Sequence, residues 1–376
     1  MVIFGAALLE TKRHCVSILG SAWHTRMTPM NPRSKVVTRT FKVVGYLTAL
    51  LTLAFGLSRI WVTVANHHHR QRQVEERLAV TKVQVAGADY ADAWETLSEA
   101  EAIALTDEVR LRQEDVAMAW LRSLNLDDLE TISDVVGRVL PVLTRGVTLR
   151  KGVRRADLLA HVGWANYLRY DAEGTRSDFG RYYDMARAID PTNPYANAFA
   201  GYCVSGSVET AKVVEYFNAA LPSGRETRLI RRLELSAFLN CDDRVVELVR
   251  LASDLVEDAE STPGNFASVL WTNVYKGSFQ SEHARETILG AIPPAKHIAI
   301  FQSFFGPGSR AYREDRWERD LWLAHILNRE GLPQDAVNVL VQTPRTDQHG
   351  TALPEFEQAW IDAAITQFNE TAQVTH

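Results

Sequence analysis

Residues 43–65 read VVGYLTALLTLAFGLSRIWVTVA, an apolar stretch broken only by a few hydroxyl side chains, two glycines and one charge, Arg59. As an α-helix this stretch would extend about 34 Å, at ~1.5 Å per residue. The hydrocarbon core of a bilayer is about 30 Å thick, so the stretch is long enough to cross it. Arg59 lies near the end at Ala65, where its long side chain can reach the headgroups. The sequence therefore predicts a transmembrane helix at residues 43–65.

The charges on either side of this stretch predict its orientation. Residues 1–42 carry a single acid, Glu10, and the following basic residues: Lys12, Arg13, Arg26, Arg33, Lys35, Arg39 and Lys42. Basic flanks favour the cytoplasmic side, so we expect residues 1–42 to form a disordered cytoplasmic tail and the rest to lie outside the cytoplasm. In a Gram-negative bacterium that location is the periplasmic face of the inner membrane. Because Arg70, Arg72, Arg77 and Lys82 follow the stretch, an array that faces the cytoplasm is the alternative.

Two other interpretations of the N-terminal region stay open. Thr63-Val64-Ala65 is a small-residue sequence after an apolar core, as at the cleavage site of a signal peptide, although Arg59 disfavours cleavage. Translation from Met27 or Met30 would leave a shorter basic tail.

Composition sets further bounds. The chain has 376 residues, of which 46% are hydrophobic and 23% charged, enough to bury a substantial core beyond the membrane. A formal net charge of −5 provides no general attraction to nucleic acid, so no nucleic-acid partner is expected. Cys203 and Cys241 can pair in an oxidising compartment, but each lies in a helix-like segment where a buried free thiol is equally ordinary.

Beyond residue 85 the apolar residues recur at intervals of three and four, and strand signals are nearly absent. Leu158, Val162, Ala165 and Leu168 illustrate this spacing. Turn signals divide the chain into helices of about 10–20 residues, a usual length in globular proteins. These signals include Gly87, Arg145-Gly146, Gly174 and Gly331. The fold class is all-α, with a helical stalk at residues 66–86 and a helical domain at residues 87–376.

One segment carries a more specific pattern. Gly174 is followed by Phe179, Tyr183, Ala186 and Pro191, at intervals of five, four, three and five. A glycine can adopt the left-handed conformation that ends one helix, and a proline stops the next. Trp164 and Tyr167 precede the glycine on the first helix.

The same intervals return elsewhere in the chain. Gly331, Ala336 and Leu340 repeat them near the C-terminus, and Asn240 leads a similar set in the middle, with asparagine in place of glycine. On these positions residues 87–376 resemble an array of tetratricopeptide (TPR) repeats, an α-solenoid of helical hairpins. The resemblance implies a scaffold that binds a protein partner in a groove along stacked helices, with no cofactor and no small-molecule substrate.

Candidate chemical sites are few. His67, His68 and His69 are adjacent, but successive residues on a helix point about 100° apart, so we expect a polar collar and no metal site. His161, His283, His297 and His325 are isolated, and no hydrolase, metalloprotease or nucleotide-binding motif is present. No catalytic residue, cofactor site or metal ligand is therefore assigned.

The densest basic segment beyond the membrane is a candidate patch for an anionic partner. It comprises Arg145, Arg150, Lys151, Arg154 and Arg155, with no acid before Asp157. The alternative for such a segment is a set of solvated or salt-bridged helix faces.

The leading functional hypothesis is a membrane-anchored scaffold without catalysis of its own. The alternative is a membrane-bound enzyme whose site is assembled from distant helices.

Overall fold

The computed structural model describes residues 32–126, 128–174 and 178–374, with only the backbone for residues 32–43 and 173. Within these ranges the chain is all-helical, and its only β-type pairing is an isolated bridge between Thr346 and Ala352. The predicted all-α class is therefore confirmed. Residues 1–31 of the predicted basic tail lie outside the described residues.

The α-helices follow one another with short connections. Their bounds are α2 Pro32–Ala86, α3 Tyr90–Ile103, α4 Asp107–Ser123, α5 Leu129–Leu149, α6 Gly152–Glu173, α7 Phe179–Ile189, α8 Pro194–Val204, α9 Thr210–Ala220, α10 Thr227–Leu239, α11 Arg244–Glu257, α12 Phe266–Leu270, α13 Glu282–Ala291, α14 Pro294–Phe304, α15 Arg310–Glu314, α16 Arg316–Arg329, α17 Pro333–Gln342 and α18 Glu355–Val374.

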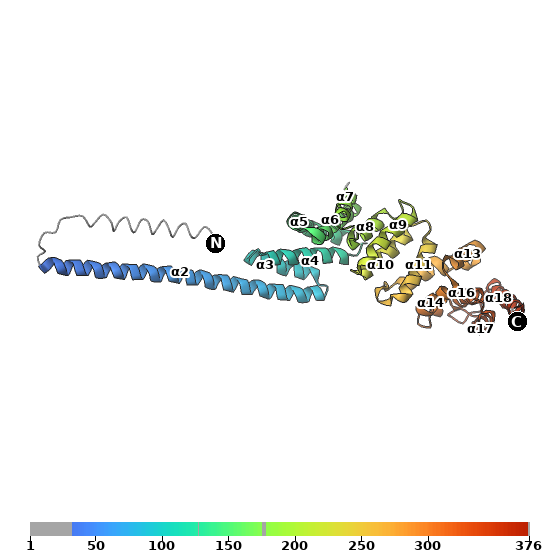
Figure 1. Ribbon diagram of the computed structural model, residues 1–376. Helices are drawn as coiled ribbons and strands as arrows, with labels where there is room; N and C mark the ends of the chain where they lie inside the picture. Colours follow the sequence, from blue (N-terminus) through green and yellow to red (C-terminus); the bar gives the residue numbers. More distant parts are fainter. Residues whose placement is uncertain (1–31, 127, 175–177, 375–376) are drawn as a thin grey trace. The chain divides into compact units, whose positions relative to one another are not determined.

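The apolar stretch forms part of α2, which is one uninterrupted helix in Figure 1. Among the described residues, one helix is long and apolar enough to cross a membrane, and it is this one. Its large apolar side chains are exposed, with Leu51 at 71% and Trp61 at 75%. Arg59 lies with its guanidinium 5.5 Å from the centre of the Phe55 ring.

The chain divides into two compact units, residues 1–76 and 77–376. We call residues 77–376 the distal unit. The predicted stalk, residues 66–86, is helical throughout, but its last turns belong to the distal unit. There Leu78 and Thr81 are buried, and Arg77 forms an ion pair of 3.2 Å with Glu99 of α3. The folded region therefore begins about three helical turns earlier than residue 87.

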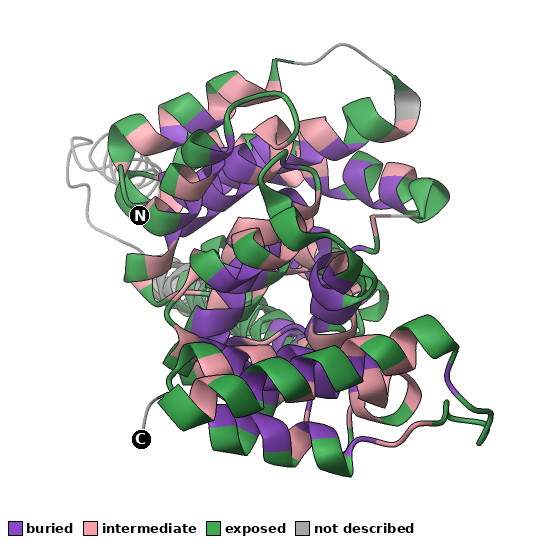
Figure 2. Cartoon of the chain, turned by 90° about the vertical axis from the view of Figure 1, so that its right-hand side faces the viewer, coloured by how far each residue is buried: buried purple, intermediate pink, exposed green. Residues whose placement is uncertain are grey.

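Within the distal unit, helices that are adjacent in sequence pack against each other. The closest pairs are α5 with α6, α6 with α7, α8 with α9, and α16 with α17. Figure 2 shows buried residues on the helix faces turned toward neighbours and exposed residues on the outer faces. The buried apolar side chains form one contiguous core from α4 to α18. This amphipathic arrangement is what the spacing of three and four predicts.

The helix pair α6–α7 is built on the residues that the sequence singled out. Gly174 ends α6 in the left-handed conformation, with φ +67°, and its N–H donates to the carbonyl of Tyr170. On α7, Tyr183 and Ala186 are buried and Phe179 is half-buried. The Trp164 and Tyr167 rings of α6 stack with centroids 5.3 Å apart, and Pro191 lies in the turn after α7.

The turn before α17 has the same form, whereas the turn after α10 differs. Gly331 has φ +83°, and both Ala336 and Leu340 are fully buried. Asn240 instead ends α10 in the right-handed conformation, with φ −95°, and its N–H donates to the carbonyls of Ala237 and Phe238. A tight turn of that kind needs no left-handed residue.

The predicted break at Arg145-Gly146 is wrong, because α5 continues through it to Leu149. Gly146 is buried, and a Cβ there would lie 3.1 Å from Leu158 and 3.2 Å from the Glu114 carboxyl group. The glycine therefore permits close packing of α4 and α6 against α5 rather than a turn.

A buried carboxyl group lies near the C-terminal end of the distal unit. Glu318 of α16 is 6% exposed and accepts a hydrogen bond of 2.7 Å from the N–H of Gly277. Burial raises the pKa of Glu318 from its ordinary value of 4.5 to about 7, and the Gly277 hydrogen bond offsets only part of this rise.

A methyl group at Gly163 tests the packing of α6 on α7. In Gly163→Ala the Cβ would lie 2.6 Å from Cε1 of the buried Tyr183 ring, so the free energy of unfolding should fall by about 1–3 kcal/mol. Urea unfolding of the full chain in a nonionic detergent measures the change. Gly137→Ala is the matched control, since no atom lies within 4 Å of its Cβ and alanine favours the helix by about 0.5–1 kcal/mol. Equal stability of the two variants would contradict the packing.

Glu318 predicts a dependence of stability on pH. Because its pKa is higher in the folded than in the unfolded chain, the folded state binds more protons between about pH 4.5 and pH 7. Its contribution to the free energy of unfolding therefore decreases across that window as pH rises, by up to about 1.4 kcal/mol per pH unit. Glu318→Gln should show a shallower decrease in unfolding titrations from pH 5 to pH 7, whereas the exposed control Glu330→Gln should follow the unmodified chain. An unchanged slope in Glu318→Gln would refute the assignment.

Candidate functional site

The predicted basic patch, residues 145–155, is largely paired with carboxylates of the same molecule. Arg145 donates to Gln113 and lies 3.6 Å from Glu101. Arg150 donates to Glu114 at 3.0 Å and to Asp107 at 2.8 Å. These arginines thus connect α5 and the start of α6 to α3 and α4, and they do not form a free basic surface.

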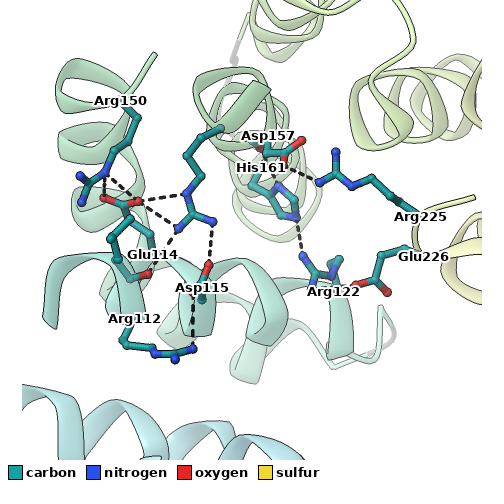
Figure 3. Close-up of polar contacts among 11 residues, drawn as sticks. Arg112, Glu114, Asp115, Arg122, Arg150, Asp157, His161, Arg225 and Glu226 are labelled. Carbon is teal, nitrogen blue, oxygen red and sulfur yellow. Dashed lines mark hydrogen bonds and ion pairs between the residues drawn. The ribbon is translucent and has the colours of Figure 1, made fainter. Parts of the chain in front are cut away.

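Arg154 completes this network, whose carboxylates Glu114 and Asp115 are labelled in Figure 3. It donates to Glu114 at 3.0 Å and to Asp115 at 2.6 Å. The Glu114 side chain is only 2% exposed, and two guanidinium groups neutralise its charge inside the protein. Lys151 is exposed and Arg155 is half-buried. Only Lys151 of the five predicted residues therefore stands fully at the surface.

Helix α4 presents a second charged face on the other side of this network. The helix is capped by Thr106, whose hydroxyl accepts a hydrogen bond from the N–H of Val109, with Asp107 and Glu108 in the first turn. Arg112, Ala119 and Arg122 are separated by seven and three residues and so share one face of the helix.

That face lines a cavity of about 380 Å³, which we call the arginine cleft. Its walls come from the end of α2, from α4, α6 and α8, and from the segment before α10. The lining residues are Thr81, Lys82, Val85, Arg112, Asp115, Val116, Met118, Ala119, Arg122, Arg154, Asp157, Tyr195 and Arg225. Five of these side chains are cationic and two are carboxylates.

A buried histidine positions Arg122. His161 is fully buried on α6, and its Nδ1 lies 2.7 Å from the carbonyl oxygen of Asp157. Its Nε2 lies 3.2 Å from Nη1 of Arg122, which can only donate, so Nε2 accepts and Nδ1 carries the proton. Burial, together with the positive charge of Arg122, holds the pKa of His161 well below its ordinary value of 6.5. The histidine therefore holds the guanidinium without neutralising it.

Asp157 positions the second guanidinium. Its Oδ2 accepts from Arg225 at 2.5 Å, and its Oδ1 accepts from Asn193 at 2.7 Å. The guanidinium carbons of Arg122 and Arg225 each lie 5.2 Å from the centre of the Tyr195 ring. Both arginines are thus held beside one aromatic ring at the wall of the cleft.

Glu226 is a further partner of Arg122. Its carboxylate lies 3.2 Å from Nη2 of Arg122. Glu226 has φ +53°, a left-handed conformation that residues other than glycine adopt uncommonly. The segment before α10 thus accepts an unfavourable backbone conformation where it meets this arginine.

Sequence reasoning did not find the cleft. Arg154 lies in the predicted basic patch, Arg225 is distant from it in sequence, and His161 is isolated from the other histidines. The only local signal was the shared face of Arg112 and Arg122. Residues as far apart as Lys82 and Arg225 approach one cavity only because the helices fold back on each other.

The two candidate cysteines do not form a disulfide. Cys203 and Cys241 are free thiols; Cys203 lies 3.5 Å from the Tyr183 hydroxyl, and Cys241 donates to the carbonyl of Ala237. In the ranges that the structure describes, no group of three or more His, Cys, Asp or Glu side chains is arranged to hold a metal ion.

No model of a known protein family matches this chain, and no curated protein shows significant similarity to it.

Loss of the Glu114 charge tests the ion-pair network. In Glu114→Gln two partly buried guanidinium groups lose their shared carboxylate, so the free energy of unfolding should fall by about 3 kcal/mol. The control is Asp134→Asn, which weakens the exposed ion pair between Asp134 and Arg138 within α5. That change should stay within about 0.5 kcal/mol. Urea unfolding of both variants in detergent makes the comparison, and similar losses would show that Glu114 contributes no more than a surface ion pair.

Proposed function

We propose that the protein is a single-pass membrane-anchored scaffold whose helical distal unit binds another protein, with no catalysis of its own. The observation that carries this proposal is the exposed apolar surface of α2, from Val44 to Val64, on a helix that continues into a large helical unit. Apolar surface of that extent is unfavourable in water and favourable in a hydrocarbon core. A bilayer provides such an environment at the length of this stretch.

The distal unit supplies the binding surface in this proposal. Its helices pack in sequential pairs, and the pairs α6–α7 and α16–α17 each turn at a left-handed glycine, Gly174 and Gly331. Tyr183 and Ala186 after Gly174 are buried, as are Ala336 and Leu340 after Gly331. These features support a TPR-like array, in which stacked hairpins present a groove to a partner segment.

The basic residues before the apolar stretch support a cytoplasmic N-terminus, which would place the distal unit outside the cytoplasm. An anchor of this kind confines the binding surface to a thin layer beside the membrane. A partner in that layer is present at a raised effective concentration, so a modest affinity suffices for recruitment.

The geometry around His161 favours binding over the enzyme alternative. An acid–base site built on His161 would require its ring to exchange protons with a carboxylate or a substrate. His161 is fully buried, and both of its nitrogens are occupied, one by a backbone carbonyl and one by Arg122.

Membrane attachment and partner capture can be tested in one experiment. A photo-crosslinking residue replaces the exposed Val153, Ile189 or Val208 of the distal unit in living cells. We expect a discrete adduct in the washed membrane fraction from at least one position. In the variant Leu51→Lys with Leu53→Lys, each charge costs about 2.5–3.5 kcal/mol at the centre of a span, so both the membrane location and the adduct should be lost.

The matched control is Val83→Lys, which places a lysine at an exposed apolar position on the same helix outside the apolar stretch and should preserve both. A reporter that is active only outside the cytoplasm, fused after His376, should be active. Retention of the double lysine variant in washed membranes would overturn the anchor. A stable, anchored chain that yields no adduct from any position would overturn the scaffold.

A further inference from the structure

We propose that the arginine cleft is a binding site for a small organic anion, a carboxylate or phosphate group attached to an apolar body. Such a ligand lies beyond the protein-binding function proposed above, because it would occupy a cavity and not the groove of the array. The inference rests on the concavity, the charge and the apolar lining of the cleft.

The shape of the cleft suits a small molecule. Five separate segments converge on about 380 Å³, so the space is walled on several sides. Pockets for small ligands are typically about 300–1,000 Å³, with a few polar groups that converge on the ligand. A groove for an extended peptide would instead run along one row of stacked helices. The geometry therefore favours a small molecule over a protein segment.

The charges of the cleft leave an excess of positive groups. Its two carboxylates already have partners, since Asp157 accepts from Asn193 and Arg225, and Asp115 accepts from Arg154. Arg112 lies 4.0 Å from Asp115, too far for a hydrogen bond, and Lys82 is exposed with no ion pair found in the described part of the chain. An anion in the cleft would thus provide a close partner for Lys82 and Arg112.

The inner cations are held in place before any ligand enters. Arg122 is fixed by the neutral His161 and by Glu226, and Arg225 is fixed by Asp157. A guanidinium has five N–H donors, so each retains donors beyond those its partners use. Fixed donors of this kind bind an oxyanion at a lower cost in side-chain entropy. His161, Asp157 and Glu226 act as positioning residues and need not touch the ligand.

Apart from Thr81 and Tyr195, the rest of the lining is apolar. Val85 comes from α2, and Val116, Met118 and Ala119 come from α4. Simple inorganic anions would leave this surface without a partner. An apolar body next to the charged group would cover it, and the two parts together define the chemical class of the ligand.

The binding experiment uses the full chain in a nonionic detergent and four probes. They are 4-phenylbutyrate, its neutral amide, phenyl phosphate and citrate. Isothermal titration calorimetry should detect 4-phenylbutyrate or phenyl phosphate with a Kd below about 1 mM and should show binding of the amide weaker by at least about tenfold. Whichever of these two anions binds more tightly identifies the charged group of the ligand, as a carboxylate or as a phosphate ester. Citrate, which lacks an apolar body, should bind more weakly than the better of them.

Two exposed cations provide the test of location. Lys82→Gln with Arg112→Gln should weaken binding of the anion by about tenfold and reduce its salt dependence, since exposed charges act through screened attraction. The matched control is Lys151→Gln with Arg138→Gln, which removes two positive charges outside the cleft and should leave the affinity unchanged. Thermal unfolding of each variant without ligand verifies that all remain folded.

Several outcomes would overturn the inference. They are equal binding of the amide and the anion, unchanged affinity in the double cleft variant, and no binding of any anion at about 10 mM. Tight binding of an acidic peptide, acetyl-Leu-Glu-Leu-Glu-amide, with no binding of the small anions would assign the cleft to a protein segment instead. Partner crosslinking in the double cleft variant separates the two proposals: if capture persists while anion binding fails, only the anion site is refuted.

Discussion

The carboxylate of Glu114 sets a constraint on which the first half of the distal unit depends. It is almost completely buried, and it accepts hydrogen bonds from Arg150 and Arg154 at the beginning of the α6 region. A buried charge without partners lowers the free energy of unfolding by several kcal/mol. Helix α4 and the α5–α6 connection must therefore pack in the one register that brings both arginines to Glu114. Gly146 permits this register, because a side chain at that position would occupy the space of the Glu114 carboxyl group.

The same network forms one wall of the arginine cleft. Arg154 bonds both Glu114 and Asp115, and therefore joins the buried side of α4 to its cleft side. Structural ion pairs thus place some of the cations of the cleft, and His161 and Asp157 place others. Lys82 and Arg112 contribute little to this framework. The groups that stabilise the fold and the groups free to attract a ligand are therefore largely different residues, although they line one cavity.

The helix pair α6–α7 was predictable because its determinants are local. The left-handed glycine at position 174 and the spacing of Tyr183 and Ala186 act within one or two helical turns. The prediction of a break at Gly146 is wrong because the conformation there depends on residues distant in sequence. Glycine occurs both where a chain turns and where two helices approach closely, so the residue type alone does not distinguish the two cases. Only the neighbours, Leu158 and Glu114, distinguish them.

The amino-acid sequence by itself determined the helical class, the apolar stretch of membrane-spanning length and the left-handed turns at Gly174 and Gly331. Each depends on side chains a few residues apart, through helix periodicity or backbone conformation. Only the tertiary structure decided which charges are free. The basic segment at residues 145–155 contains no acid, yet carboxylates from residues 101–115 pair with three of its arginines. Electrostatic pairing depends on distance in space, and the folding of α3 and α4 against α5 and α6 sets that distance.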